Sequence, residues 1–194
     1  MHRVGGVDLL AGVWEKRPGK RTASDLPWHH RVVPEQEWPD DWSDRKAGKD
    51  CAICRALAQV DGKDSGDNWV WIHDGGFTRT YLERHSRLPG YCVVVWKNGH
   101  VVEPHDLDPD AAAGYWRELL EVGRAIEARF QPVKLNYQML GNWVPHLHTH
   151  VLPRYLDDPA PGGPLPWGSH LSTGLLPETE ARAQAQDLRR LLGA

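Results

Sequence analysis

Apolar residues in the middle of this 194-residue chain fall in short runs of the kind that form β-strands. Such runs cover residues 69–72, 77–82 and 91–96, and two more follow at 134–140 and 146–152. A turn-forming Asp-Gly-Gly separates the first two runs, and the third is apolar throughout, which indicates a strand buried on both faces. These patterns predict a sheet of about five strands.

A long helix is predicted between the third and fourth strands. Asp108 is suited to cap its first turn, and Pro109 fits the first helical position. Apolar residues then recur at steps of three and four and share one face: Ala112, Tyr115, Trp116, Leu119, Val122, Ile126 and Phe130. Because Tyr115 and Trp116 are adjacent, both cannot point at one core, and one of them could face a second subunit. The expected fold is α+β, an antiparallel sheet with the 108–130 helix packed on it.

The two ends of the chain differ from its middle. Residues 1–49 contain four prolines and no sustained period, so they are predicted to form an N-terminal extension. Their four tryptophans leave two interpretations open, a disordered leader or an extension partly packed on the main domain. Residues 50–156 are predicted to be the folded domain. Residues 157–194 are predicted to be a Pro/Gly-rich tail with a terminal helix over 178–192.

Composition places the chain among ordinary globular proteins, with 40% hydrophobic and 25% charged residues. The net charge of −3 argues against broad electrostatic binding to nucleic acid or anionic lipid. No apolar run approaches the roughly 18 residues that a membrane-spanning helix needs. The N-terminus lacks the apolar segment of a secretory signal, and three cysteines are too few for a disulfide scaffold. A cytoplasmic protein without nucleic-acid or membrane partners is expected.

The most informative segment is the fifth predicted strand, in which His146, His148 and His150 alternate with smaller or apolar residues. Successive side chains of a strand point to opposite faces, so the three imidazoles should share one face. Such a row is unsuited to an apolar core, because each buried ring nitrogen needs a partner; a solvent-exposed strand is the alternative. Aligned imidazoles could bind a metal, hold an anion or supply a nucleophile, since they are largely unprotonated near neutral pH.

The order of these segments resembles the histidine triad (HIT) superfamily of nucleotide hydrolases and transferases. Four ordered segments carry the resemblance, namely a Pro-Gly-led strand, a helix start, two asparagine-containing stretches and the His-x-His-x-His row, at residues 89–101, 106–110, 135–142 and 146–152. The resemblance spans about residues 51–155. It implies the HIT-like fold, which is α+β with an antiparallel sheet of about five strands and a long helix packed on it.

The resemblance also implies an enzyme that hydrolyses or transfers at phosphoanhydride or phosphoramidate bonds. His148 would attack the α-phosphate of a dinucleoside polyphosphate, a nucleoside phosphoramidate or a similar adenylylated compound, forming a covalent nucleotidyl intermediate. A neighbouring backbone carbonyl would fix its tautomer. His150, Asn136 and Asn142 would bind the phosphate or the leaving group. Many relatives carry a histidine directly after the Pro-Gly, where this chain has Tyr91, so no single subfamily supplies the substrate by analogy.

Cys51 and Cys54 form a C-x-x-C pattern that, taken alone, fits either a metal site or a redox pair. In zinc-containing relatives, including the galactose-phosphate uridylyltransferase branch, histidines at the positions of His100 and His146 complete a Cys2His2 set. The resemblance therefore implies a structural zinc ion in a closed tetrahedral site. His105 is a competing ligand.

Relatives often pair into homodimers through the long helix and a neighbouring strand, so a homodimer is expected. One alternative function is a nucleotide-binding regulatory protein with little turnover, which would bind a nucleotide tightly without cleaving it. Another is a zinc-stabilised interaction module whose Trp-rich extension captures a partner, a property that deletion of the extension would remove without loss of hydrolysis.

Overall fold

A computed structural model describes residues 38–58, 64, 68–84, 88–158, 162–163 and 174–193. The chain divides into two units, residues 1–38 and 39–194, and all the elements below belong to the second unit. Most of the predicted extension and much of the predicted Pro/Gly-rich tail lie outside the described residues. In the described part of the chain, no helix combines the length and the hydrophobicity needed to cross a bilayer.

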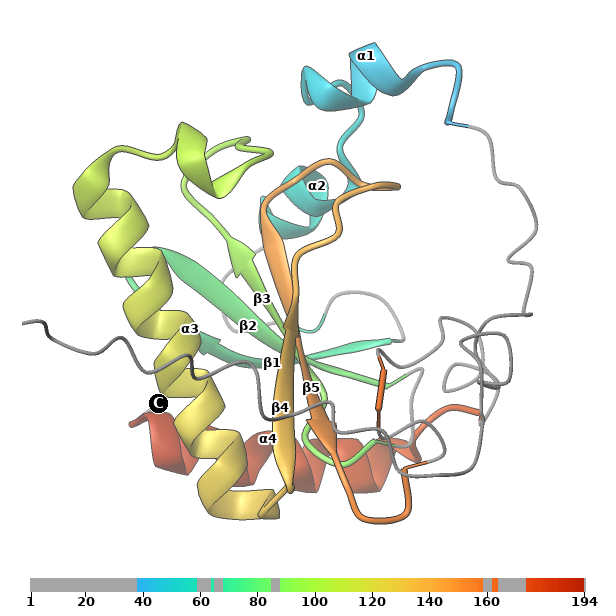
Figure 1. The fold of residues 1–194 in the computed structure, drawn as a ribbon, viewed down its shortest axis with the longest axis vertical. Helices are drawn as coiled ribbons and strands as arrows, with labels where there is room; N and C mark the ends of the chain where they lie inside the picture. Colours follow the sequence, from blue (N-terminus) through green and yellow to red (C-terminus); the bar gives the residue numbers. More distant parts are fainter. Residues whose placement is uncertain are drawn as a thin grey trace, which may run out of the picture. The chain divides into compact units, whose positions relative to one another are not determined.

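The described elements comprise two short helices, five strands and two longer helices (Figure 1). In chain order they are α1 (Trp42–Lys46), α2 (Ala52–Leu57), β1 (Trp69–Asp74), β2 (Thr78–Glu83), β3 (Cys92–Trp96), α3 (Pro109–Phe130), β4 (Lys134–Gln138), β5 (His148–Arg154) and α4 (Glu178–Leu192). The sequence patterns did not predict α1 and α2. With five and six residues, these helices are too short to show a period.

The five strands form one open sheet in the order β1-β2-β3-β5-β4, and every neighbouring pair is antiparallel. The predicted α+β fold with an antiparallel sheet of about five strands is therefore confirmed. The strand that carries the histidines lies between β3 and β4, and β4 forms an edge of the sheet. His148 lies opposite Val95 and His150 opposite Val93, so each histidine shares a face with its valine.

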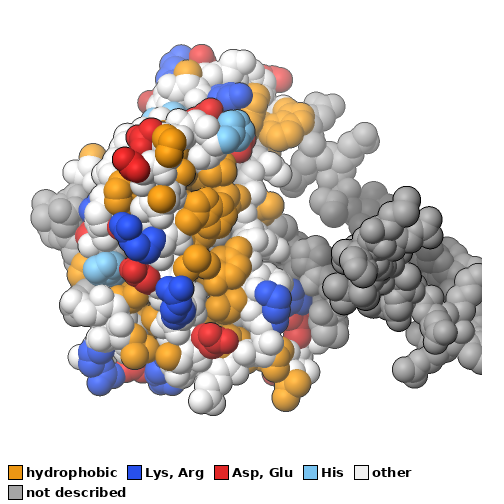
Figure 2. Space-filling view, turned by 60° about the vertical axis from the view of Figure 1, so that its left-hand side comes forward, with side chains coloured by type: hydrophobic (Ala, Val, Ile, Leu, Met, Phe, Trp, Pro, Cys, Tyr) orange, Lys and Arg blue, Asp and Glu red, His pale blue; other side chains and the backbone are white. Residues whose placement is uncertain are grey.

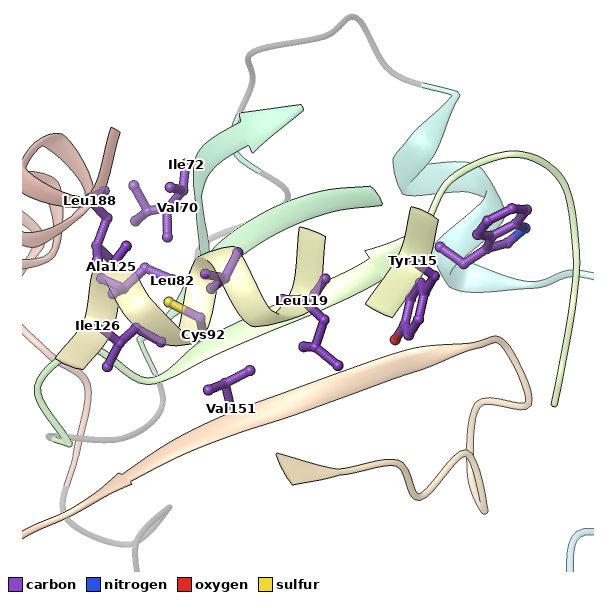
Figure 3. Packing of buried hydrophobic residues seen from close by; sticks show 14 of the residues in the cluster. Val70, Ile72, Leu82, Cys92, Tyr115, Leu119, Ala125, Ile126, Val151 and Leu188 are labelled. Carbon is purple, nitrogen blue, oxygen red and sulfur yellow. The ribbon is translucent and has the colours of Figure 1, made fainter. Parts of the chain in front are cut away.

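The first face of the sheet, called the helix face below, is covered by α3 and α4. Figure 3 shows Leu119 and Ile126 of α3 packed toward Val151 of β5, with Leu188 of α4 near the strand β1. All four side chains are fully buried. Burying such side chains stabilises the fold by about 1.5–3 kcal/mol each, so this face holds the main core.

The long helix α3 begins and packs as its sequence predicts. The Asp108 carboxylate accepts a hydrogen bond from the backbone N–H of Ala111 at 2.9 Å, and Pro109 occupies the first turn. Gly123 lies where the helix meets β4, and a Cβ there would be 2.2 Å from the hydroxyl oxygen of Tyr137. The glycine therefore costs helix propensity but allows α3 to approach the sheet edge closely.

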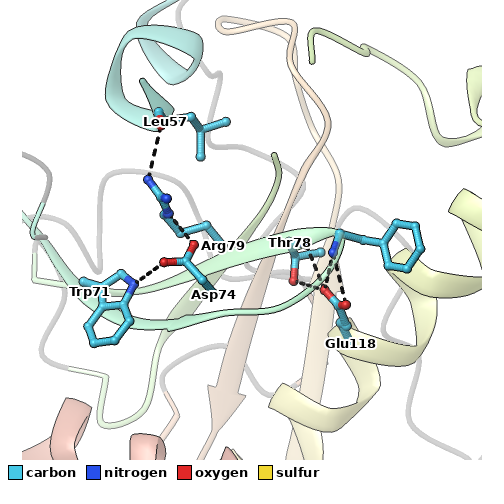
Figure 4. A network of polar contacts seen from close by, with 7 residues as sticks. Leu57, Trp71, Asp74, Thr78, Arg79 and Glu118 are labelled. Atoms are coloured by element: carbon cyan, nitrogen blue, oxygen red, sulfur yellow. Dashed lines mark hydrogen bonds and ion pairs between the residues drawn. The ribbon is translucent and has the colours of Figure 1, made fainter. Parts of the chain in front are cut away.

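The opposite face, called the histidine face below, carries His148 and His150 beneath the short helix α2. A smaller apolar cluster supports it, formed by Cys51, Ile53, Tyr81, Tyr91, Val93, Val95 and Leu152. Buried polar contacts hold α2 and the β1–β2 hairpin in place (Figure 4). Arg79 donates to Asp74 at 2.5 Å and to the carbonyl of Leu57 at the end of α2 at 3.4 Å. The Glu118 carboxylate of α3 accepts from the backbone N–H and the hydroxyl of Thr78.

Candidate active site and metal centre

The histidine row divides between strand β5 and the residues just before it. β5 begins at His148, and His146 precedes it, although the carbonyl of Leu147 still accepts from the N–H of Trp96 at 3.0 Å. The rings of His148 and His150 lie 5.0 Å apart between centroids. The ring of His146 lies instead 5.3 Å from that of His100. The row therefore serves two neighbouring sites.

His148 has one ring nitrogen fixed and the other left as an acceptor. Its Nδ1 lies 2.6 Å from the carbonyl oxygen of His146. Because a carbonyl can only accept, Nδ1 carries the proton and Nε2 carries the lone pair. Burial lowers the pKa of His148, against the opposing effect of this hydrogen bond, so the ring is neutral at pH 7. A neutral imidazole with a free Nε2 is the form of histidine that can act as a nucleophile.

His148 and His150 line a cavity of about 670 Å³, a size typical of small-molecule sites. The cavity runs between α2 with the start of β1 and the loop of residues 140–144. Its remaining walls are mostly apolar, formed by Ala52, Ile53, Ala56, Asn68, Trp69, Leu140, Gly141, Asn142, Trp143 and Val144. A few polar groups at an apolar hollow are what a ligand with a flat ring and a polar head requires.

The third histidine of the row, His150, is held by Tyr91, the residue between the Pro-Gly and β3. The hydroxyl oxygen of Tyr91 lies 2.7 Å from Nδ1 of His150. Tyr91 is 1% exposed, and burial raises its pKa, so the phenol stays protonated. Tyr91 therefore fixes the ring of His150 through one nitrogen.

The two predicted asparagines lie in different places. Asn142 lines the cavity of His148 and His150. Asn136 lies on β4 and lines a second cavity of about 590 Å³, where its side-chain oxygen accepts from Arg154. The structure thus brings Asn142 to the histidine cavity and does not bring Asn136 there.

Cys51, Cys54, His100 and His146 form a cluster that could hold a metal ion, with all four ligand atoms within 4.8 Å of one another. Nδ1 of His146 lies 3.6 Å from Sγ of Cys51 and 3.5 Å from Sγ of Cys54. Nδ1 of His100 lies 3.5 Å from Sγ of Cys54. Zinc–sulfur and zinc–nitrogen bonds of about 2.3 and 2.0 Å place such ligand atoms about 3.5 Å apart on a tetrahedral ion. The three sulfur–nitrogen distances in the cluster match that spacing.

The second nitrogens of both histidines support the same assignment. Nε2 of His146 lies 2.8 Å from the carbonyl oxygen of Trp96, and Nε2 of His100 lies 3.2 Å from that of Lys46. Both Nε2 atoms therefore donate, and both Nδ1 lone pairs point at the sulfurs, as in ordinary metal-ligating histidines. The pKa of His146 is lowered to about 4, mainly because the ring is buried, so this ring is neutral at pH 7.

The surroundings of Cys54 favour the neutral thiol. Burial, together with the neighbouring Cys51, raises the pKa of Cys54 to about 11. A divalent cation would offset this by favouring the thiolates. His105, the competing ligand, is largely exposed and lies 3.9 Å from the carboxylate of Asp106, outside the cluster. The structure therefore brings His100, and not His105, to the cysteines.

The resemblance implied the carbonyl that orients His148, but sequence reasoning missed the cavity wall formed by the loop of residues 140–144 and the carbonyls that orient His146 and His100. The aromatic walls Trp69 and Trp143 come from a strand and from an irregular loop more than seventy residues apart. The available signal was a tryptophan in a Gly-Asn-Trp-Val-Pro stretch, three residues before His146. The carbonyls of Trp96 and Lys46 carry no signal in side-chain chemistry at all.

Comparisons with known proteins point to one family. Residues 72–157 match the HIT domain family. A protein from Bacillus subtilis called Protein hit is 24% identical over 113 residues, which is 55% of this chain and 72% of that protein. The bis(5′-adenosyl)-triphosphatase of Saccharomyces cerevisiae is 27% identical over 84 residues. This match covers 41% of this chain and 41% of the yeast enzyme, so the chain spans about two fifths of the enzyme's length.

Solved structures give the same result. A histidine triad protein from Bradyrhizobium japonicum has a TM-score of 0.56 at 28% identity, over 64% of this chain and 90% of that one. One from Sinorhizobium meliloti has a TM-score of 0.57 at 26% identity, over 63% and 89%. A zinc-bound histidine triad family protein from Mycobacterium smegmatis shares the fold, with a TM-score of 0.51 at 21% identity over 74% and 94%.

Proposed function

The chain contains a HIT domain, and from this premise we propose that it is a nucleotide hydrolase or nucleotidyltransferase with His148 as its nucleophile. The observation that carries the proposal is the orientation of His148. Its Nδ1 proton is held by the carbonyl of His146, so the Nε2 lone pair is the free one, and the ring lines the 670 Å³ cavity. Expected substrates are dinucleoside polyphosphates, nucleoside phosphoramidates and similar adenylylated compounds.

In the first step, Nε2 of His148 attacks the α-phosphorus of the substrate. A P–N bond to His148 forms as the P–O or P–N bond to the leaving group breaks, and the leaving group keeps that electron pair; a phosphate departs as an anion, whereas an amine takes up a proton from water as it departs. His150 and Asn142 lie in the same cavity and could donate hydrogen bonds to phosphoryl oxygens, where negative charge concentrates in the transition state. Tyr91 keeps His150 aligned for this role.

In the second step, water or another acceptor attacks the same phosphorus and breaks the bond to His148. Nε2 recovers its lone pair, the attacking water or other acceptor gives up its proton to solvent, and a nucleoside monophosphate or its transfer product is released. Each step displaces one ligand of phosphorus with inversion, so the reaction as a whole retains configuration. The backbone carbonyl of His146 bonds to Nδ1 throughout, which stabilises the positive charge that the ring carries while it is substituted.

We further propose that Cys51, Cys54, His100 and His146 hold a zinc ion. Four protein ligands make a closed site, so the ion supplies a structural cross-link between α2, the segment after β3 and the segment before β5. His146 then belongs to both sites, because its ring faces the metal cluster and its carbonyl orients His148. The thiolate ligands must stay reduced, which fits the cytoplasmic location proposed for this protein.

A homodimer is proposed from the surface of α3 and β4. Trp116 and Leu120 on α3 are each 43% exposed, and Tyr137 on the edge strand is 40% exposed. Figure 2, in which the α3 side of the domain comes forward, shows apolar side chains gathered in a band across this surface. Of the adjacent pair on α3, Tyr115 is fully buried, and Trp116 is the residue left to face a partner. A free edge strand beside an apolar helix fits a sheet continued into a second copy.

Substitution of the proposed nucleophile tests the enzymatic function. His148→Ala should lower release of AMP from a dinucleoside polyphosphate and from an adenosine phosphoramidate by at least about 10³-fold. Zinc content and the circular dichroism spectrum should be unchanged. His105→Ala, at an exposed histidine, is the matched control and should retain wild-type turnover. Retained turnover in His148→Ala would overturn the assignment, and tight AMP binding by a wild-type protein that cleaves neither substrate would favour the regulatory alternative.

A further inference from the structure

Trp143 occupies an unusual position at the border of the histidine cavity. It lies in the loop between β4 and His146, and its side chain is 57% exposed although it lines the cavity. It also lines a second hollow of about 240 Å³, bordered by Asp41, Arg45, Lys49 and Asp50. A single exposed apolar side chain needs no explanation by itself, but this one borders two hollows at once. Trp143 therefore forms a partition at the solvent side of the site.

The ring of Trp143 is held in place by a residue from α1. The guanidinium carbon of Arg45 lies over the indole, 5.7 Å from the ring centroid, and Nη1 of Arg45 donates to the Trp143 carbonyl at 3.2 Å. Nε of Arg45 is in turn paired with the carboxylate of Asp41 at 2.8 Å. One arginine thus contacts both the ring and the backbone of Trp143, which restrains this exposed side chain.

We propose that Trp143 is a platform on which an aromatic ring of the leaving group stacks, and that Arg45 is the residue that positions it. The inference rests on the proposed function and names the residue that selects, among those substrates, the ones whose leaving group carries a planar aromatic ring, such as a second nucleoside. Tryptophan presents the largest flat apolar face among the side chains, and stacking on it tolerates different ring types.

The in-line geometry of phosphoryl transfer places the leaving group near Trp143. The attacking and leaving atoms lie on opposite sides of phosphorus. His148 is 9% exposed and rises from the sheet at the floor of the cavity, so the leaving group departs away from the sheet, toward solvent. Trp143 is the most exposed aromatic wall on that side, whereas Trp69 is half-buried and donates from its indole N–H to Glu83 at 2.6 Å. The nucleoside then occupies the more enclosed wall of α2 and Trp69.

Two substrates that differ only in the leaving group test the platform. They are the adenosine 5′-phosphoramidates of 2-phenylethylamine and of n-butylamine, assayed with the metal-loaded full chain. Trp143→Leu, which keeps apolar bulk, should lower the ratio of kcat/KM for the phenylethyl over the butyl substrate about tenfold, because the stacking contact is lost. Trp143→Phe, which keeps a flat ring, should restore much of the ratio.

Arg45 is tested through the same ratio. Arg45→Met should lower it about threefold to fivefold, and in the Trp143→Leu background the same change should add nothing, because Arg45 acts only through Trp143. Arg190→Met, at an exposed arginine of α4, is the matched control and should leave the ratio at the wild-type value.

The outcomes separate this inference from the function on which it rests. An equal loss on both substrates in Trp143→Leu would place the residue on the nucleoside side and overturn the leaving-group platform. Wild-type kcat/KM on both substrates in Trp143→Leu would overturn it as well. Neither result would affect the role of His148, which fails only if His148→Ala still turns the substrates over. An additive loss in the Arg45→Met, Trp143→Leu double variant would remove Arg45 from the account.

Discussion

The helix face and the histidine face belong to one sheet, but their polar side chains differ in what they contact. On the helix face, Thr149 is fully buried and its hydroxyl is 2.7 Å from the hydroxyl of Tyr115 on α3. On the histidine face, the neighbouring His148 has Nδ1 bonded to a carbonyl, while Nε2 is left for a ligand. Adjacent residues of one strand therefore serve stability and chemistry separately.

This division follows from the two-residue period of a strand and from what covers each side. Two long helices cover one face and bury an apolar core. Among the described residues, the other face is bordered by the short helix α2, the start of β1, the Cys/His cluster and the loop of residues 140–144, and a cavity lies between them. Changes on the helix face should therefore alter stability alone, and changes on the histidine face should alter metal content or turnover.

Loss of a metal ligand is expected to have the largest effect. Cys54→Ser should abolish stoichiometric zinc binding and lower the free energy of unfolding by at least about 3 kcal/mol, because metal binding at a structural site contributes directly to folding. Turnover should fall further than the folded fraction, since His146 both faces the metal and orients His148. Zinc quantification, urea unfolding and turnover measure the three effects.

The third cysteine supplies the control for this variant. Cys92 is fully buried on the helix face, away from the cluster. Cys92→Ala should keep stoichiometric zinc while losing some stability. Zinc retained in Cys54→Ser, or lost in Cys92→Ala, would contradict the assignment of the metal set.

A substitution that creates a cavity in the core of the helix face is expected to have the next largest effect, and to change stability alone. Leu119 is fully buried between α3 and the sheet, so Leu119→Ala should lower the free energy of unfolding by about 2–5 kcal/mol. Turnover per folded molecule and zinc content should match the wild type. Denaturant unfolding and steady-state kinetics on the same preparation test this, and a large drop in turnover of the folded protein would show that the faces are coupled.

The smallest effect is expected where α3 meets α4 at the surface. Arg129 pairs with Asp187 at 2.5 Å, and this hydrogen bond holds the pKa of Asp187 below its usual value of 3.8. A carboxyl group whose pKa is lowered by folding stabilises the folded state at pH values above its unfolded pKa. This stabilisation is lost as the pH falls through the lower pKa of the folded state. Asp187→Asn should therefore lower the free energy of unfolding by about 0.5 kcal/mol or less at pH 7, since the pair is exposed to solvent.

This difference between Asp187→Asn and the wild type should shrink as the pH falls from 3.8 through the lower pKa of the folded state, because below that second pKa the carboxyl group is neutral in both the folded and the unfolded protein. Urea unfolding at neutral and acid pH measures it. A difference that grows toward acid pH would contradict the role of the ion pair.

The sequence predicted the elements whose residues carry a repeating pattern. Asp108, Pro109 and the apolar stripe placed α3, and short apolar runs placed all five strands, because period and capping are local properties. The resemblance of four ordered segments pointed to the HIT fold, and so to a site in which Cys51, Cys54, His100 and His146 meet. Local patterns alone left a metal site and a redox pair equally open.

The remaining parts depend on contacts between distant segments. Tyr91 meets His150 across 59 residues, and Arg45 meets Trp143 across 98, and nothing local to either residue signals its partner. The position of Asn136 also depends on such a contact. Its place on β4 was predictable, but the cavity that it faces depends on its neighbour Arg154 across the strand pair.

The most direct test of the central claim is to trap the bond between phosphorus and His148. The metal-loaded protein is mixed with an adenosine phosphoramidate, stopped within one turnover at alkaline pH, where a phosphohistidine bond survives, and digested for mass spectrometry. We expect an adenylyl group on His148 in the wild type, at an amount that rises and decays with turnover, and none in His148→Ala. Full turnover with no adduct, or an adduct on His150 instead, would contradict the account.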